Sequence, residues 1–178
     1  MKRVAVILLL IGVCRSGNAG TLRIDILKNP GGVVCCSVGR NTRCSTAEWV
    51  RKNIGSRLLV TGETSQQWQQ YKVTIVPREN GPIQMILLAD EKSAPILYDG
   101  FHVSGSSFLN GDFETFQNDG SPGEWKLING KLLSEGGKIG RHCVAVTHEN
   151  RAIREIIGRK GSPIEISFWA KDLPSRKP

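Results

Sequence analysis

Hydrophobic and polar residues alternate along several short segments of this 178-residue chain. In TLRIDIL, Leu22, Ile24 and Ile26 lie on one side of an extended chain, and Arg23 and Asp25 lie on the other. A period of two predicts β-strands that bury one face. Five further segments predict strands: YKVTIVP (71–77), PIQMILLAD (82–90), PILYDGFHVSG (95–105), RHCVAVTHE (141–149) and PIEISFWAKD (163–172).

Gly, Pro, Asn and Asp separate these segments, and long helical patterns are nearly absent. Short strands at close intervals are typical of an all-β protein, so we expect an antiparallel β-sandwich or jelly roll. One helix is a candidate at 45–53, with Ser45 or Thr46 as its N-cap and Glu48 in its first turn. The alternative is a strand centred on Trp49.

The first 19 residues are typical of a secretory signal peptide. Lys2 and Arg3 precede an apolar run, Val4 to Val13, and Gly17-Asn18-Ala19 offers a small-residue cleavage site. We therefore expect a mature chain that begins near Gly20 and is secreted or periplasmic. The ten-residue run is much shorter than the roughly 20 residues that span a bilayer, and no later segment is long enough. Lipid attachment at Cys14 is the alternative, although Val13 precedes it where a small residue is expected.

The mature chain has the length of one domain and a mild positive charge. The chain has 24 basic and 16 acidic residues, and three of the basic ones lie in the signal, so the charge falls from +8 to +5. Nucleic-acid or membrane partners are usually recognised by clustered Lys and Arg. The densest groups here, 151–160 and 175–178, are interrupted by apolar residues or lie at the chain end, so we expect neither partner.

Four cysteines remain after cleavage: Cys35, Cys36, Cys44 and Cys143. Export favours their oxidation, and four cysteines allow three complete pairings. Adjacent Cys35 and Cys36 rarely meet the geometry of a disulfide, whereas a short loop closed by Cys44 with either of them is plausible. The oligomeric state is not encoded in any such pattern.

Two groups of motifs resemble the carbohydrate-binding modules of the galactose-binding-like jelly-roll group, families four, nine and twenty-two among them. LNGDFETFQNDGSPGEW (109–125), GKIGRHCVAV (137–146) and IEISFWAKD (164–172) resemble the first half of such a module, in which an N-G-x-F-E strand opens the domain. WQQYKVTIVP (68–77), GPIQMILLAD (81–90) and ILYDGFHVSG (96–105) resemble its second half.

The order of the two halves is reversed relative to that family. Residues 20–105 resemble the C-terminal half and residues 108–172 the N-terminal half, and we expect residues 173–178 to form a flexible tail. One explanation is a single circularly permuted sandwich over 20–172, because the termini of a compact domain often lie close together. The other is the end of one module joined to the start of a truncated next one. We favour the permuted sandwich, because two half-sandwiches would leave open edges.

The resemblance implies a structural calcium ion held by Asp99 and Glu114. Calcium prefers carboxylate and backbone oxygens that arrive from separate segments. The alternative is that Asp99 caps a turn with Gly100 and Glu114 is an ordinary surface residue.

Sugars are bound by flat aromatic faces and by planar polar side chains. Trp169 is the leading ligand candidate. The apolar residues Ile164, Ile166 and Phe168 lie on the other side of its strand, so Trp169 is expected to face outward. Gln84 interrupts an apolar strand, and Trp49 and Tyr98 are further candidates. We expect Trp68 and Trp125 to be core residues beside turns.

No catalytic arrangement is evident, so we expect a protein that is not an enzyme. Asp112, Glu114, Asp119 and Glu124 cluster in sequence, but clustering alone does not give the separation of a glycosidase pair. The resulting hypothesis is an exported module that binds a polysaccharide or oligosaccharide. The alternatives are a structural or protein-interaction sandwich without a sugar site, and a fragment of a larger multi-module glycosidase or surface protein.

Overall fold

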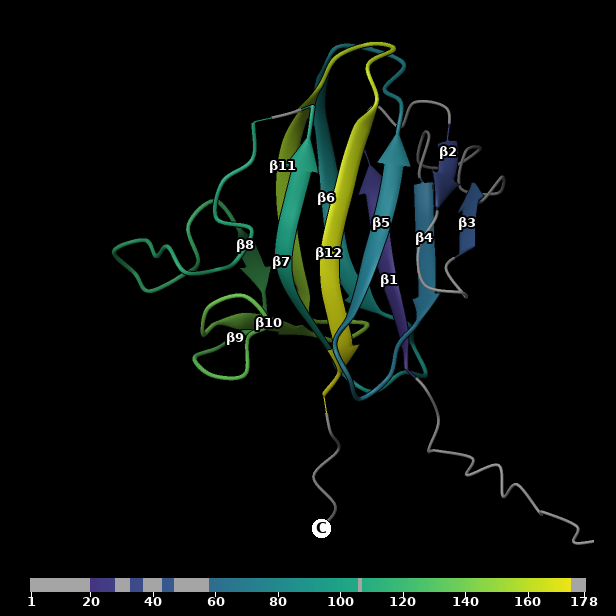
Figure 1. Cartoon of the computed structure of the whole chain (residues 1–178). Coiled ribbons are helices and arrows are strands. Elements are labelled where there is room, and N and C mark those ends of the chain that lie inside the picture. Colours follow the sequence, from purple (N-terminus) through teal and green to yellow (C-terminus); the bar gives the residue numbers. More distant parts are fainter. Residues whose placement is uncertain (1–19, 28–32, 37–42, 47–57, 106, 174–178) are drawn as a thin grey trace, which may run out of the picture.

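A computed structural model describes residues 20–27, 33–36, 43–46, 58–105 and 107–173. Within these residues the chain is all β, with no helix. Figure 1 shows the strands packed in two layers. They are β1 (Thr21–Leu27), β2 (Val33–Cys36), β3 (Arg43–Thr46), β4 (Leu58–Glu63), β5 (Gln69–Ile75), β6 (Gly81–Ala89), β7 (Ile96–Ser104), β8 (Lys126–Ile128), β9 (Lys131–Leu133), β10 (Cys143–Val146), β11 (Arg151–Gly158) and β12 (Ile164–Asp172).

The strands form two six-stranded sheets. Sheet A has the order β3-β4-β1-β6-β11-β8, and sheet B has the order β2-β5-β12-β7-β10-β9. All named strand pairs are antiparallel. The predicted antiparallel β-sandwich is therefore confirmed. In Figure 1, β7, β12 and β5 of sheet B lie in front of β11, β6 and β1 of sheet A.

Both sheets contain strands from the two resembling halves, and in sheet B these strands are interleaved. In sheet B, β12 lies between β5 and β7, and in sheet A, β11 lies beside β6. Their inward residues share one hydrophobic core. Neither half completes either sheet by itself, because the central strand of sheet B comes from one half and both of its neighbours come from the other.

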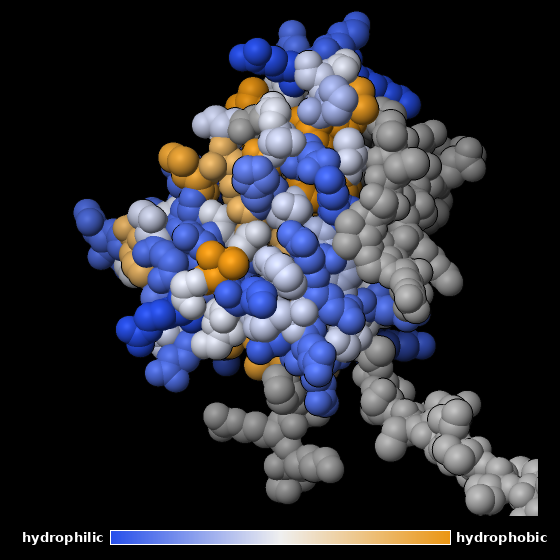
Figure 2. All heavy atoms as spheres, in the orientation of Figure 1, coloured by the Kyte–Doolittle hydropathy of each residue, from blue (hydrophilic) through white to orange (hydrophobic). Residues whose placement is uncertain are grey.

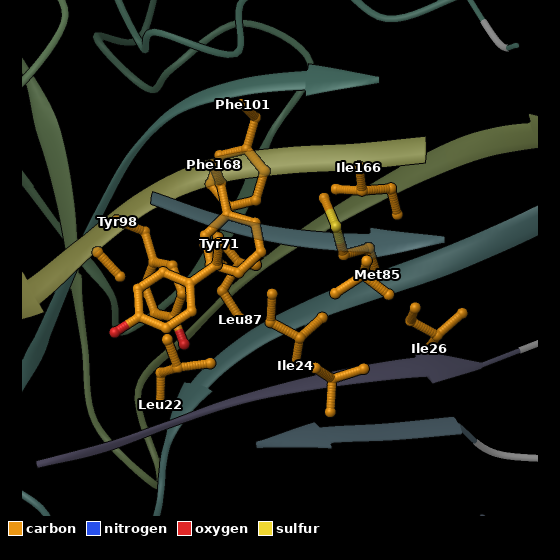
Figure 3. Packing of buried hydrophobic residues seen from close by; sticks show 14 of the residues in the cluster. Leu22, Ile24, Ile26, Tyr71, Met85, Leu87, Tyr98, Phe101, Ile166 and Phe168 are labelled. Carbon is orange, nitrogen blue, oxygen red and sulfur yellow. The ribbon is translucent and has the colours of Figure 1, made fainter. Parts of the chain in front are cut away.

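Aromatic residues organise the core at one end. The ring of Phe168 stacks on Tyr71 at 5.5 Å and on Phe101 at 5.0 Å between centroids, and Phe101 also contacts Trp125 at 5.3 Å. Figure 3 shows how Phe168, Phe101, Tyr71 and Tyr98 gather at this end, with aliphatic side chains beyond them. Rings at these separations make favourable contacts in addition to the area they bury.

The strands with clear period-two patterns are confirmed at β1, β5, β6, β7, β10 and β12. No strand was predicted at β2, β3, β4, β8, β9 or β11. In β11 the inward residues include Ala152, Arg154 and Gly158, so its alternation is not one of large apolar and polar residues. The helix predicted at 45–53 does not begin at Ser45, because Ser45 and Thr46 end β3, and residues 47–57 lie outside the described residues.

The N-G-x-F-E segment is a turn-rich loop and not the strand that the resemblance implied. Asn110, at φ 54°, holds the loop with its side-chain amide. Its Nδ2 donates to the carbonyl oxygens of Thr115 (2.9 Å) and Gly123 (2.7 Å), and its Oδ1 accepts from Thr115 N–H. The carbonyl oxygen of Asn110 accepts from Trp125 Nε1 at 2.9 Å. These bonds position Phe113 and Trp125 in the core, which confirms the prediction for Trp125.

Candidate functional site

A β-bulge in β7 arranges the outer face of sheet B around Trp169. In the pairing of β7 with β12, Ser167 is opposite His102 and Trp169 is opposite Asp99, so Phe168 alone is opposite two residues. The extra residue is Gly100, whose φ of 60° suits a bulge. The bulge allows Tyr98 and Phe101 both to face the core while Asp99 and His102 face outward. Trp169, next to buried Phe168, also faces outward and is half-buried.

Polar side chains surround Trp169 on this outer face. Gln70 of β5 is directly opposite Trp169 and is exposed. The next row along the strands consists of Lys72, Ser167 and His102. Beyond it, Lys72 makes an ion pair with Glu165 at 2.6 Å. Figure 2 shows this side of the molecule as mostly hydrophilic over β7, β12 and β5, with isolated hydrophobic residues.

The loop 137–142 lies beside Trp169. The ammonium group of Lys138 is 4.6 Å from the centroid of the Trp169 ring. Ile139 and Trp169 both lie close to Gly100: a Cβ atom on Gly100 would lie 2.8 Å from Ile139 Cγ1 and 2.9 Å from Trp169 Cδ1. Gly100 thus lets the loop and the indole ring approach the strand closely. The loop places a positive charge over the Trp169 ring.

Asp99 holds the first part of this loop. Its Oδ2 accepts hydrogen bonds from the backbone N–H groups of Lys138 (2.5 Å) and Ile139 (2.8 Å), and its Oδ1 accepts from Gly100 N–H at 2.6 Å. The side chain is fully buried. Burial raises the pKa of Asp99 to about 6, and the three backbone hydrogen bonds oppose that rise.

Glu114 holds the second part of the same loop. Its Oε1 accepts from the backbone N–H groups of Arg141 (2.5 Å) and His142 (2.7 Å), and its Oε2 lies 2.7 Å from His142 Nδ1. Hydrogen bonds from the backbone and side chain of His142, together with Arg141 N–H, lower the pKa of Glu114 to about 2. We call Asp99 and Glu114 the carboxylate clamp.

The carboxylate clamp does not fit the calcium ion that the resemblance implies. A calcium site needs carboxylate and carbonyl oxygens directed at one point, whereas backbone N–H donors are directed at both carboxylates here. No group of three or more His, Cys, Asp and Glu side chains that could hold a metal ion occurs among the described residues. The two predicted residues act on one loop, but as acceptors of backbone hydrogen bonds.

A second tryptophan lies on the same face of sheet B. Trp68 is partly buried and packs against a small second hydrophobic cluster that contains Leu97, Cys143 and Ala145, so it has a packing role, as predicted, but outside the main core. The ammonium group of Lys171 is 4.7 Å from the centroid of its ring. Lys171 is two residues from Trp169 on β12, so the two lysine–tryptophan pairs lie about 7 Å apart along the strand.

Two of the other predicted ligand residues, Gln84 and Tyr98, do not join Trp169. Gln84 alternates with the inward Ile83 and Met85 of sheet A, so it lies on the opposite outer face of the sandwich. Tyr98 is fully buried, and its hydroxyl donates towards the carbonyl oxygens of Leu88 (2.7 Å) and Arg23 (3.3 Å). The expectation that Tyr98 contacts a ligand is therefore corrected. Trp49 lies outside the described residues.

The four clustered acids have separate local partners. Glu124 forms an ion pair with Arg154 at 2.5 Å, Asp119 accepts from Ser121 N–H and Oγ, and Glu114 belongs to the carboxylate clamp. Asp112 accepts a long 3.4 Å hydrogen bond from Glu114 N–H. These partners explain the acids as parts of a folded loop.

Cys143 is the cysteine whose side chain the structure describes. Cys143 is a free, buried thiol, and burial raises its pKa to about 11. The side chains of Cys35, Cys36 and Cys44, and hence their pairing, lie outside what the structure describes.

Sequence reasoning missed Gln70, Lys138 and Lys171. Gln70 alternates with inward Tyr71, and Lys171 shares the outward side of β12 with Trp169, so alternation alone was sufficient to find these two. Lys138 reaches Trp169 from a loop, and no local pattern indicates that contact.

The described residues include no helix with the length and apolar character of a membrane span. No protein-family model, curated protein or solved structure matches this chain.

Proposed function

We propose that this protein is a non-catalytic, exported carbohydrate-binding module, a galactose-binding-like jelly roll with its halves in permuted order. The single observation that carries the proposal is the setting of Trp169. Its half-buried indole lies on an open, polar sheet face beside Gln70, Ser167 and His102. An aromatic ring supplies a surface for the apolar side of a sugar, and the planar and hydroxyl groups supply hydrogen bonds.

The interleaved strands support the permuted single domain. The two resembling halves share both sheets and one core. Joined fragments of two modules would instead bury those strands against partners outside this chain. A thermal melt of the mature chain tests whether it folds as one domain. A cooperative transition would support the single permuted domain, and the absence of one would indicate a fragment of a larger protein.

The charges on this face favour an acidic glycan. Lys138 and Lys171 each lie against a tryptophan ring, and neither has a carboxylate ion-pair partner among the described residues. The neighbouring acids are already compensated, Asp99 by three N–H groups and Glu165 by Lys72. A neutral sugar must displace the Lys138 ammonium from the ring, whereas a uronate or sulfate group offers that ammonium an ion pair in exchange.

Titration calorimetry with polygalacturonate, dextran sulfate and neutral xylan and β-glucan tests this proposal. Trp169→Ala should weaken binding by about tenfold or more, because the main apolar contact is lost. Gln84→Ala, on the opposite face, is the matched control and should bind like the wild type. Absence of binding to any glycan by the folded protein would contradict the proposal and favour a structural or protein-interaction sandwich.

Lysine variants separate acidic from neutral recognition. Lys138→Gln should lower affinity for the acidic polymers by about tenfold, as for loss of a charge-assisted hydrogen bond. It should not lower affinity for the neutral polymers, because no ammonium group then has to leave the Trp169 ring. Lys126→Gln, an exposed lysine on β8 of sheet A, is the control. Equal affinity for neutral and acidic glycans would overturn the charge preference and leave the Trp169 site intact. Equal binding to a DNA oligonucleotide would indicate general polyanion binding instead.

A further inference from the structure

The first described residue, Gly20, is buried where the first and last strands of the fold meet. Its backbone nitrogen donates to Asp172 Oδ2 at 3.2 Å, and its carbonyl oxygen accepts from Thr64 N–H at 2.9 Å. Asp172 ends β12, so the contact joins positions 152 residues apart. Thr64 Oγ1 also donates to the other carboxylate oxygen of Asp172.

Little space for a side chain remains at this position. A Cβ atom on Gly20 would lie 2.8 Å from Thr64 Oγ1 and 3.0 Å from Ile96 Cδ1, and closer still to Asp172 Oδ1. Real Cβ atoms do not approach this closely, so the side chains that surround Gly20 would have to move. The nitrogen of residue 20 is thereby held against a carboxylate that is only 8% exposed.

Buried carboxylates are usually paired with a positive charge, but Asp172 receives none from a described side chain within ion-pair distance. Asp172 instead accepts from one backbone N–H group and one hydroxyl group. As long as the Ala19–Gly20 peptide bond is intact, the two carboxylate oxygens of Asp172 therefore accept hydrogen bonds only from neutral donors. The sequence immediately before it, Gly17-Asn18-Ala19, is the predicted signal cleavage site.

We propose that a signal peptidase cleaves the Ala19–Gly20 bond and that the new α-ammonium group of Gly20 forms a buried ion pair with Asp172. Hydrolysis adds one water across the peptide bond and leaves a carboxylate on Ala19 and an amino group on Gly20, which takes up a proton. The charged donor replaces a neutral N–H at the same place, and charge-assisted hydrogen bonds are roughly twice as strong as neutral ones. Because Gly20 is buried in the fold, cleavage precedes the docking of β1.

The cleavage site is tested by expressing the full chain in an exporting bacterial host and determining the N-terminus of the product by mass spectrometry. The expected first residue is Gly20. A different first residue, including a lipid-modified Cys14, would overturn the proposal.

The ion pair is tested by melting two forms of the protein, one beginning at Gly20 and one retaining residues 16–19. Asp172→Asn should lower the melting temperature by several degrees more in the form that begins at Gly20. If Asp172→Asn prevents folding in both forms, the melting temperatures of the two forms that retain Asp172 are compared instead. The form that begins at Gly20 should melt several degrees higher than the form that retains residues 16–19. Acetylation of its α-amino group should remove this difference. Equal losses, or equal melting temperatures, would overturn the ion pair.

Discussion

Asp99 and Glu114 hold one loop from both ends of a five-residue stretch. Asp99 accepts the N–H groups of Lys138 and Ile139, and Glu114 accepts those of Arg141 and His142. This loop places the Lys138 ammonium over Trp169. The carboxylate clamp therefore determines the shape of the proposed ligand face without being part of it.

Replacing Glu114 with Gln should loosen the loop. The substitution removes the negative charge and one acceptor oxygen, and we expect about 1–2 kcal/mol lower stability, as for the loss of hydrogen bonds to a charged group. Amide hydrogen exchange at Arg141 and His142 should accelerate. Glu135→Gln, an exposed acid in the turn after β9, is the control and should change neither quantity. Unchanged exchange in the Glu114 variant would contradict the clamp.

The two clamp residues should give opposite pH dependence. Glu114 has a pKa lowered to about 2 from an ordinary 4.5, so its stabilisation is complete above about pH 4.5 and is lost as the pH falls towards 2. Asp99 has a pKa raised to about 6 from 3.8, so the folded state holds its proton more tightly. The Asp99 contribution therefore grows as the pH falls from 6 to about 4.

Thermal melts between pH 2 and 8 check these signs. The melting temperature of the wild type relative to Asp99→Asn should rise as the pH falls from 6 to 4. The advantage of the wild type over Glu114→Gln should shrink below pH 4.5. A pH-independent difference for either variant would show that the clamp residue does not titrate as its surroundings require.

Replacing Gly100 with Ala should displace Trp169. The left-handed conformation alone costs about 1–2 kcal/mol for a residue with a side chain, and the added methyl group also meets Ile139 and Trp169. Gly120→Ala is the matched control, because Gly120 has φ 78° and no atom within 4 Å of an added Cβ. Both variants should lose stability, but only Gly100→Ala should shift the indole N–H resonance of Trp169 in NMR spectra.

Calcium should not act through the carboxylate clamp. N–H donors are directed at both carboxylates, so we expect the melting temperature of the wild type to be the same in calcium and in a chelator. A calcium-dependent rise that Glu114→Gln abolishes would show that the loop rearranges to admit the ion, as the family resemblance implies.

The sandwich was predictable because large β-branched and aromatic residues mark the inward side of its longest strands, as in β5 and β12. β11 was not, because a buried arginine stands at an inward position, where its guanidinium pairs with Glu124. Trp169 was correctly assigned to the outside by alternation with Phe168. Its separation from Gln84 required knowledge of which sheet each strand joins. The contact with Lys138 depends on hydrogen bonds that the loop donates to Asp99 and Glu114, over 39 and 27 positions of the chain.

The central place of β12 also constrains how the protein is made. Residues 164–172 supply the strand that joins β5 to β7, so sheet B has no continuous ladder until nearly all of the described chain has been synthesised. Earlier strands must wait, with unpaired edges, for a segment about a hundred residues downstream of β5. Long-range pairing of this kind slows folding and exposes aggregation-prone edges. Folding of this sandwich is therefore best served by a biosynthetic pathway that keeps the chain unfolded until its synthesis is complete.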